Sequence, residues 1–260
     1  MASKVKKDLI IGDTSQVAQY FDQKIIRSSS RRIDDKIFLE KWNRVYLCFA
    51  EQRTSLSKVA EFKELFYSVN FDKTMMIINR IKAKKIIFLS TTELWNMCTG
   101  PIDLSIDFNF RQNYYTDSKL KITQKLKNRE NVIIAYPFNF NSKFRSKFFL
   151  FGKVFDSITN KTKIELGNVD FKRDLMHTKY VSSQLKNILE SKVIGSGRLT
   201  HVGDFINDLY AHANLNHKKY VTYNLTLKQN KINRKENWCS ILDDDYSYNK
   251  LLLETIEEIL

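Results

Sequence analysis

The sequence predicts an α+β protein with a central antiparallel β-sandwich or barrel, flanked by N-terminal and C-terminal helices. Two observations predict this class. Short apolar, β-branched runs with turn-like connections follow one another through residues 74–172. Segments with helical spacing lie before and after them. We therefore divide the chain into a basic leader and helical N-terminal region (1–73), a β-rich core (74–172) and a mostly helical C-terminal region (173–260), which one compact domain could contain.

The N-terminal region contains one clear helical pattern, over residues 57–69. Its expected apolar face is Val59, Phe62, Leu65, Phe66 and Val69. Residues 44–49 fit a strand as well as they fit a helix, so both interpretations remain open. The tract Arg27–Arg32 is small, polar and basic. It predicts an exposed linker, and a phosphorylation site or a localisation patch is the alternative.

The central strands are predicted from apolar runs and from period-two alternation. The expected strands are 75–78, 85–89, 102–110, 120–126, 131–140 and 147–155, with 161–171 as a further candidate. The alternation is strictest in residues 102–110. Short turn-like connections favour antiparallel pairing of these strands.

The C-terminal region contains three helical patterns and one strand pattern. The helices are expected over 181–189, 202–213 and 248–260, and an edge strand over 220–227. The apolar face of the last helix is large enough for protein–protein contact, although docking on its own core is the commoner role of such a face. We expect its acids to weaken nucleic-acid binding in either case.

Most of the formal net charge of +14 lies between Arg111 and Lys163, a segment with twelve Lys and Arg and only three acids. Ten aromatic residues are interleaved with these charges. Cations neutralise phosphates and aromatic faces stack on bases, so the segment predicts a surface for single-stranded nucleic acid, with RNA favoured. The alternative is that the aromatic residues fill a core. The expected binding residues are Lys119, Lys121, Lys125, Lys127, Arg129, Lys143, Arg145 and Lys147.

Sequence motifs for catalysis or cofactor binding are absent, so we expect no enzyme, no cofactor and no metal. No Walker loop, GxGxxG, GxSxG or HExxH occurs, and glycine is scarce for a phosphate cradle. The three cysteines include no CxxC pair, which argues against zinc and for a reducing compartment. Asp103 and Asp107 would share one face of the 102–110 strand. They leave a metal-dependent nuclease or replication initiator as an alternative.

Residues 75–143 resemble the core of the thirty-kilodalton superfamily of plant-virus movement proteins. The resemblance consists of an apolar strand (86–89), the turn Gly100-Pro101, an alternating strand with Asp107 as the family aspartate, and an apolar strand (132–135) closed by 136–139. It implies a jelly-roll-like core, cooperative binding of single-stranded nucleic acid, self-association and targeting to plasmodesmata.

The resulting prediction is a viral movement protein that carries a genome between cells. A viral matrix or nucleocapsid protein is the alternative, since both are basic and lack catalytic motifs. The sequence has no signal-peptide pattern and no apolar run long enough to span a bilayer. We therefore expect the host cytoplasm and plasmodesmata, with peripheral contact to anionic membrane left open.

Overall fold

The computed structural model describes residues 7–108, 112–224 and 237–260. The chain forms two compact units, and each unit is built from several stretches of sequence. Unit 1 comprises Met1–Asn96, Leu104–Pro137 and Ser182–Val193, and unit 2 comprises Met97–Asp103, Phe138–Val181 and Ile194–Leu260.

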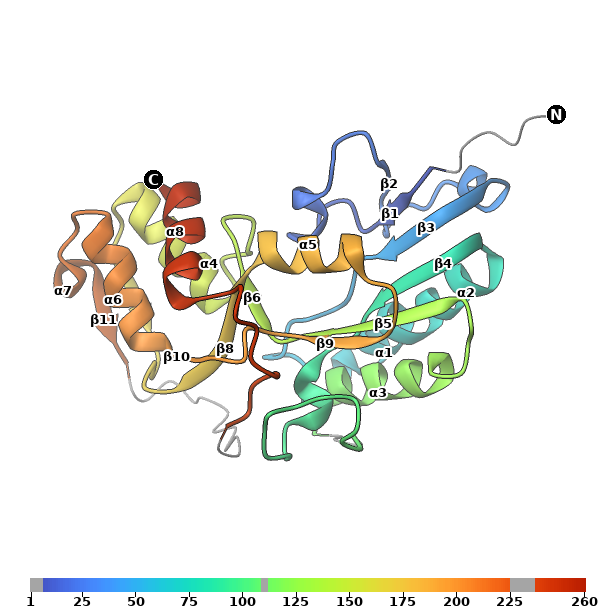
Figure 1. The fold of residues 1–260 in the computed structure, drawn as a ribbon. Helices are drawn as coiled ribbons and strands as arrows, with labels where there is room; N and C mark the ends of the chain where they lie inside the picture. The colour runs from blue at the N-terminus through green and yellow to red at the C-terminus, as the bar shows by residue number, and fades with distance from the viewer. Residues whose placement is uncertain (1–6, 109–111, 225–236) are drawn as a thin grey trace. The chain divides into compact units, whose positions relative to one another are not determined.

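Unit 1 is built on a six-stranded sheet with the order β2-β1-β3-β4-β5-β9 (Figure 1). The strands are β1 Leu9–Ile11, β2 Ile26–Ser28, β3 Lys41–Leu47, β4 Lys82–Leu89, β5 Val132–Pro137 and β9 Lys192–Ile194. The ladders that join β2, β1, β3, β4 and β5 are all parallel. Strands of a parallel sheet are covered on both faces, which explains why β1 and β5 are apolar and buried along their whole length.

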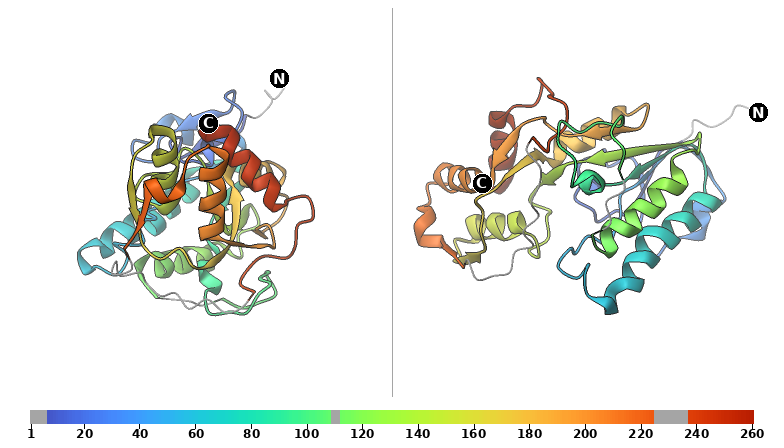
Figure 2. Two further views of the ribbon diagram at one scale, coloured as in Figure 1. Left: turned by 90° about the vertical axis from the view of Figure 1, so that its left-hand side faces the viewer. Right: turned by 90° about the horizontal axis from the view of Figure 1, so that it is seen from below.

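Helices cover the sheet of unit 1. A helical segment runs from Lys63 to Arg80 as α1 Lys63–Tyr67, a π-helical stretch Ser68–Lys73, and α2 Thr74–Arg80. It lies beside α3 Tyr114–Leu126 on one face of the sheet (Figure 2). Helix α5 Thr178–Asn187 carries the chain from unit 2 back into unit 1.

The first two crossovers of the sheet are unusually short. Residues 12–25 join β1 to β2 and contain only the 3-10 helix Ala18–Tyr20. The connection from β2 to β3 contains only the 3-10 helix Asp35–Phe38. Parallel strands usually need an α-helix for such a crossover, so the N-terminal half of this α/β sheet is reduced to its strands and turns.

The predicted antiparallel β-sandwich or jelly-roll-like core is wrong, because the largest sheet is parallel and has helices between its later strands. Three predicted strands are helical: 75–78 lies in α2, 120–126 in α3, and 147–155 largely in α4 Leu150–Asn160. Short apolar runs fit a buried helix face and a strand equally well, and the period alone did not separate them. The predicted strand 102–110 forms only one bridge, Ile102 to Ser240, within its described part 102–108, and residues 109–110 lie outside the described residues.

Other predicted elements are present. The 85–89 strand lies in β4 and residues 131–140 contain β5. Residues 44–49 belong mostly to β3, which decides between the two open interpretations. The three C-terminal helices correspond to α5, α6 Val202–His212 and α8 Tyr248–Ile259.

Unit 2 combines two small sheets with a group of helices. One sheet has the order β10-β8-β6, and the other pairs β11 with β7. The strands are β6 Asn139–Asn141, β7 Ile164–Leu166, β8 Lys172–His177, β10 Leu199–His201 and β11 Val221–Tyr223. Helices α4, α6 and α8 pack on one another, with Phe205 at the centre: its ring lies 5.6 Å from that of Phe151 and 6.1 Å from that of Tyr248. Helix α7 His217–Tyr220 follows α6.

The last helix, α8, docks inside unit 2 against α4, α6 and β8. Its buried residues are Leu251, Leu252, Thr255 and Ile259. Docking on its own core, the alternative interpretation, is therefore what the structure shows for this face. No helix in the described part of the chain has the length and apolar character needed to cross a membrane.

Candidate functional site

The carboxyl ends of the parallel strands in unit 1 form one edge of the sheet. Gly12 follows β1, Cys48 follows β3 and Ser90 follows β4. The chain goes from β1 to β2 on one side of β1 and returns to β3 on the other side, so the strand order reverses between β1 and β3. Open α/β sheets bind ligands at this edge, beside the point of reversal. This edge is the candidate site.

Gly12 makes a tight turn at the end of β1. Its φ is 102°, a left-handed conformation that favours glycine. A Cβ atom there would lie 2.7 Å from the carbonyl oxygen of Cys48. The Gly12 N–H donates to the carbonyl oxygen of Ser28 at 2.9 Å. The turn is thus held closely between the ends of β2 and β3, where only glycine fits.

The segment after β2 is polar and basic. Ser28 ends the strand, and the Oγ of Ser29 accepts a hydrogen bond from the Arg31 N–H at 3.2 Å. The side chains of Arg31 and Arg32 are exposed. No carboxylate occurs between Ser28 and Arg32. Because Gly12 bonds to Ser28, this basic turn adjoins the Gly12 turn.

Two hydroxyl residues follow β4. The Oγ of Ser90 lies 2.7 Å from Oγ1 of Thr123, which ties the end of β4 to α3. Thr91 caps the 3-10 helix Thr92–Trp95, and its Oγ1 accepts from the Glu93 N–H at 3.2 Å. Among the described residues no hydrogen bond uses the hydroxyl hydrogen of Thr91, so this hydrogen is available to a ligand.

Helix α3 brings a tyrosine and a lysine to the same edge. Asn113 and Thr116 form a capping box that fixes where the helix begins. Tyr115 and Lys119 are four residues apart, which places them one above the other on one helix face. Both side chains are buried. The start of α3 therefore presents a phenol and an ammonium group together.

Lys119 is the most unusual group of the site. It is only 2% exposed, and its Nζ donates to the carbonyl oxygen of Leu89 at 2.8 Å, two residues before Thr91. The Nζ also lies 4.7 Å from the centre of the Phe88 ring. No described carboxylate forms an ion pair with it. Burial lowers the pKa of Lys119 to about 7, so its proton is exchangeable near neutral pH.

Asn70 holds α3 in place from the π-helical stretch. Its Nδ2 donates to Oγ of Ser118 at 3.1 Å and to the carbonyl oxygen of Glu51 at 3.2 Å. Its Oδ1 accepts from the Glu51 N–H at 2.8 Å. The loop after β3 and the helix that carries Tyr115 and Lys119 are thereby fixed to one buried amide. Rigid support of this kind is what a site needs to keep its geometry.

The chemistry available at this edge is proton exchange with an oxygen of a bound molecule. A hydroxyl hydrogen (Thr91) and a phenol (Tyr115) can both bind such an oxygen. The neighbouring Lys119 ammonium favours the phenolate form of a tyrosine and can replace its proton. An alcohol or a carbonyl group of a ligand is the group that this arrangement suits.

Comparison with known proteins gives matches in structure only. No protein-family model and no curated protein sequence matches the chain. UDP-glucose 4-epimerase from Thermotoga maritima, solved with UDP-glucose, matches with a TM-score of 0.77 at 14% identity over 97% of this chain and 98% of that chain. UDP-N-acetylglucosamine 4-epimerase from Methanobrevibacter ruminantium, in complex with UDP-N-acetylmuramic acid, matches with a TM-score of 0.75 at 13% identity over 98% of both chains.

A further match is RMD from Pseudomonas aeruginosa complexed with NADPH, with a TM-score of 0.73 at 14% identity over 98% of this chain and 97% of that chain. The chain shares the fold of these proteins. That likeness and the parallel sheet overturn the resemblance to plant-virus movement proteins, whose alternating strand is not formed in the described residues 102–108. The predictions of a movement protein and of a protein without catalytic activity are corrected with it, and nothing supports targeting to plasmodesmata.

The predicted nucleic-acid surface is corrected as well, because its residues are divided between the two units and several of them are buried or already paired. Five of them, Lys119, Lys121, Lys125, Lys127 and Arg129, lie in unit 1 on α3 or just after it, and the other three, Lys143, Arg145 and Lys147, lie in unit 2. Lys119 is buried in the site described above. Lys121 pairs with Asp117 at 3.6 Å, Arg129 bonds to Asn79, and Lys147 pairs with Asp156 at 2.7 Å.

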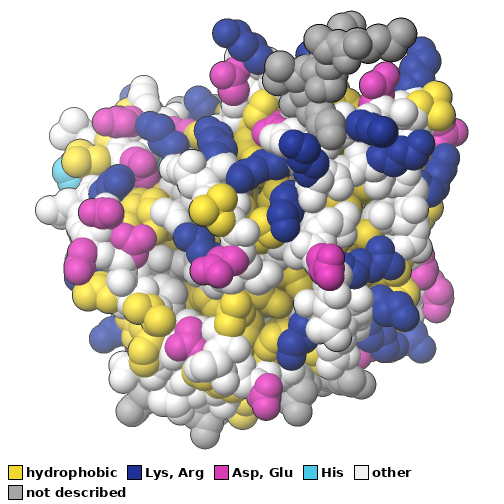
Figure 3. Space-filling view, turned by 45° about the vertical axis from the view of Figure 1, so that its right-hand side comes forward, with side chains coloured by type: hydrophobic (Ala, Val, Ile, Leu, Met, Phe, Trp, Pro, Cys, Tyr) yellow, Lys and Arg dark blue, Asp and Glu magenta, His cyan; other side chains and the backbone are white. Residues whose placement is uncertain are grey.

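The basic side chains are also mixed with acids. On the face drawn in Figure 3, Lys and Arg side chains are interspersed with Asp and Glu. The aromatic residues expected to stack on bases are largely in the core: Tyr115, Tyr136, Phe138, Phe151 and Phe155 are all buried. The alternative interpretation, that aromatic residues fill a core, is correct for these five. The predicted single-stranded nucleic-acid partner is therefore corrected; the matched structures hold UDP-N-acetylmuramic acid, NADPH and UDP-glucose.

Asp107 does not have the place that the sequence interpretation gave it. It is exposed and lies in a loop, outside any strand. The loop is held by the indole of Trp95, whose Nε1 donates to the carbonyl oxygen of Ile106 at 2.7 Å. In the described part of the chain no group of His, Cys, Asp and Glu could hold a metal ion. Neither the family-aspartate role nor a paired-aspartate metal site is supported.

Sequence reasoning missed Gly12, Thr91, Tyr115 and the role of Lys119. One signal is present: Tyr115 and Lys119 have helical i, i+4 spacing, but no helix was predicted there and the residues from 120 on were predicted as a strand. Another was Gly12, a single glycine directly after a short apolar strand. Its signal is weak because the dinucleotide-binding motif is recognised by several spaced glycines, and residues 9–25 contain only this one.

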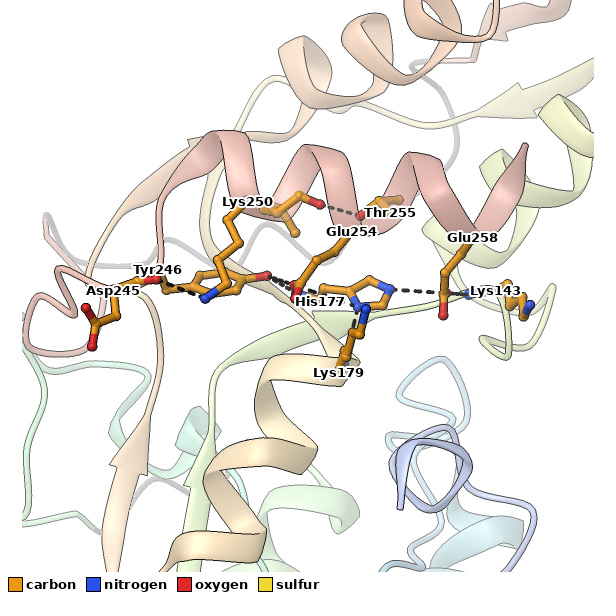
Figure 4. Close-up of polar contacts among 10 residues, drawn as sticks. Lys143, His177, Lys179, Asp245, Tyr246, Lys250, Glu254, Thr255 and Glu258 are labelled. Atoms are coloured by element: carbon orange, nitrogen blue, oxygen red, sulfur yellow. Dashed lines mark hydrogen bonds and ion pairs between the residues drawn. The ribbon is translucent and has the colours of Figure 1, made fainter. Parts of the chain in front are cut away.

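A second buried polar cluster lies in unit 2 (Figure 4). The ring of His177 is fully buried between two acids of α8, with Nε2 3.1 Å from Glu258 and Nδ1 3.9 Å from Glu254. The His177 N–H donates to the hydroxyl of Tyr246 at 2.7 Å, and that hydroxyl donates to Glu254 at 3.2 Å. These contacts fasten α8 to β8, which gives the cluster a structural role.

Proposed function

We propose that the chain is an enzyme that uses a nicotinamide dinucleotide to act on a nucleotide-activated sugar. The observation that carries the proposal is Lys119, a buried lysine with a pKa lowered to about 7, one helical turn after Tyr115 at the carboxyl edge of a parallel sheet. Perturbed ionisable groups of this kind gather at active sites. The matched structures named above, two sugar-nucleotide epimerases and a protein bound to NADPH, support this class of substrate and cofactor.

The residues at this edge fit such a dinucleotide. Gly12 supplies the sharp turn after β1, with space that a Cβ would fill. The polar turn after β2 lies where the adenosine ribose binds in dinucleotide-binding sheets. When bound, the nicotinamide exchanges a hydride with a carbon of the substrate.

The protein's own residues would handle the proton. Thr91 and Tyr115 bind the substrate oxygen whose carbon changes oxidation state. Tyr115 takes the proton from an alcohol or gives it to a carbonyl group. Lys119 favours the phenolate of Tyr115 and returns its proton. The chemistry therefore covers a reductase, an epimerase or a dehydratase, all of which begin or end with such a transfer.

The first test is binding of NADPH or NADH to the purified protein, followed by intrinsic fluorescence. The second is turnover of UDP-glucose, UDP-N-acetylglucosamine and GDP-mannose with added NAD or NADP, followed by anion-exchange chromatography of the sugar nucleotides. We expect binding of at least one dinucleotide and conversion of at least one sugar nucleotide. Absence of dinucleotide binding by a folded protein would refute the proposal.

Tyr115→Phe is the sharpest variant, because it removes one hydroxyl. We expect turnover to fall by about 100-fold or more, since positioned acid–base groups contribute about 10²–10⁴-fold. Tyr114→Phe, at the neighbouring position of the same helix, is the matched control and should keep its activity. Equal activity of the two variants would remove Tyr115 from the mechanism.

A further inference from the structure

The turn after β2 lacks the group that a site for NAD normally uses. In dinucleotide-binding sheets an acid about 20 residues after the glycine turn binds the ribose 2′-hydroxyl, whereas a nearby arginine accommodates the 2′-phosphate of NADP. Here positions 28–32 read Ser-Ser-Ser-Arg-Arg. The next acid, Asp34, accepts from the Lys36 N–H at 2.9 Å as the cap of a 3-10 helix.

The position of this turn is fixed by backbone contacts within unit 1. Ser28 pairs in register with Ile11, the last residue of β1. Its carbonyl oxygen accepts from the Gly12 N–H at 2.9 Å. The basic turn therefore begins beside the glycine turn.

The arginines of this turn are available to an anion. In the described part of the chain, Arg31 and Arg32 form no ion pair, and both are exposed. Arg27 differs, because its Nη2 donates to the carbonyl oxygen of Phe21 at 3.1 Å. The Ser29 Oγ accepts from the Arg31 N–H, which orders the backbone that carries the first arginine.

The shortened crossover between β1 and β2 increases the importance of these cations. The pyrophosphate of a dinucleotide is usually held at the N-terminus of the helix that follows β1. In this chain residues 12–25 contain only the 3-10 helix Ala18–Tyr20, and the N–H of its first residue, Ala18, already donates to Oγ of Ser15 at 3.2 Å. Compared with a site that has an α-helix after β1, this site offers fewer contacts to the pyrophosphate. Other parts of the cofactor then contribute a larger share of the binding free energy.

We propose that the chain selects NADP(H) over NAD(H), and that Arg31 and Arg32 bind the 2′-phosphate. This inference rests on the proposed function. The selectivity comes from two charge-assisted hydrogen-bonding groups that NAD(H) cannot use. Because no α-helix follows β1 to hold the pyrophosphate, the 2′-phosphate would be the main anionic anchor of the cofactor.

The experiment compares NADPH with NADH by calorimetric titration of the full-length protein. We expect NADPH to bind at least about tenfold more tightly, as one charge-assisted hydrogen bond is enough for that ratio. Adenosine 2′,5′-bisphosphate should compete with NADPH, whereas 5′-AMP at the same concentration should not. Equal affinities for NADPH and NADH would overturn the selectivity and leave the proposed function standing, while binding of neither would overturn both.

Variants test whether Arg31 and Arg32 cause the preference for NADPH. Arg31→Ala and Arg32→Ala, singly and together, should weaken NADPH binding by about tenfold or more in the double variant while NADH binding changes by less than about twofold. Ser29→Asp should likewise weaken NADPH more than NADH, because a carboxylate repels the 2′-phosphate. Lys63→Ala removes one exposed charge of α1 and serves as the control, with unchanged NADPH affinity. If the double variant keeps the NADPH preference, the assignment to Arg31 and Arg32 is wrong.

Discussion

Asp174 in unit 2 and Lys119 in unit 1 are both charged residues buried in the core, but their partners differ. The carboxylate of fully buried Asp174 accepts five hydrogen bonds, from N–H and Oγ of Ser196, from N–H of Gly197, and from N–H and Oγ of Ser240. Lys119 donates to one carbonyl oxygen and has no acidic partner among the described residues.

The difference in hydrogen-bond partners distinguishes a structural role for Asp174 from a functional role for Lys119. A buried charge that is fully hydrogen-bonded holds together the segments that carry its donors, here the backbone around Ser196 and around Ser240. A buried charge without a counter-ion destabilises the fold, so its presence calls for another explanation. Proton exchange at the candidate site provides that explanation for Lys119. The predictions below test this contrast.

Removal of Asp174 should have the largest effect on stability. Asp174→Ala removes the acceptor of the N–H groups of Ser196, Gly197 and Ser240 and of two serine hydroxyls, and we expect the free energy of unfolding to fall by about 3–5 kcal/mol. Urea denaturation followed by circular dichroism measures it. Asp244→Ala, whose side chain is 89% exposed, is the control and should change the value by less than about 0.5 kcal/mol. A loss of less than about 1 kcal/mol in Asp174→Ala would show that the hydrogen bonds of Asp174 contribute little to stability.

Lys119→Met should have the opposite effect on stability and should abolish turnover. Methionine fills a similar volume without a charge, so we expect the variant to be as stable as the parent protein or more stable, by up to about 3 kcal/mol. Lys125→Met, on the exposed side of the same helix, should change neither quantity. Strong destabilisation by Lys119→Met would mean that the lysine has a structural role like that of Asp174.

The pH dependence of stability should identify Lys119 directly. The pKa of Lys119 is about 7 in the folded chain, whereas that of a solvated lysine is 10.5, so between these pH values the unfolded chain binds more protons. The free energy of unfolding should therefore rise from pH 7 to pH 9, with a slope of up to about 1.4 kcal/mol per pH unit. The slope should be smaller in Lys119→Met by that contribution. Parallel curves for the two proteins would show that the lysine is not perturbed.

The smallest effect is expected at the His177 cluster. Glu258→Gln keeps an acceptor for Nε2 of His177 and for the Lys143 N–H, which lies 3.2 Å from Glu258. We expect a loss of about 1 kcal/mol or less in the free energy of unfolding. Exposed Glu257→Gln is the control. A loss similar to that of Asp174→Ala would show that the His177 cluster is as important for stability as the hydrogen bonds of Asp174.

Part of this fold could be predicted from local patterns. The helices α6 and α8 follow clean i, i+3, i+4 spacing with a cap, and the apolar run of β4 defines a strand. The pairing of strands could not be predicted in the same way. Strands alternating with helical patterns are the sequence signal for a parallel sheet. Here the first two crossovers contain only a 3-10 helix each, so that signal is missing.

The candidate site was hidden for a related reason. Lys119 belongs to a dense run of basic residues, and its burial depends on which face of α3 meets the sheet. Thr91 and Tyr115 lie 24 positions apart and are brought to one edge only by the parallel order of β4 and β5. Charge density pointed to a surface, whereas the decisive residue of that run is inside the protein.

The division of the chain also has a consequence for its synthesis. Residues 138–181 belong to unit 2, and residues 182–193 belong to unit 1 again. Strand β9 then forms the edge of the sheet beside β5. Until this part emerges from the ribosome, β5 is an unprotected apolar edge, and such edges promote association between nascent chains. The order of translation therefore makes the early chain dependent on chaperones or on rapid docking of its last strand.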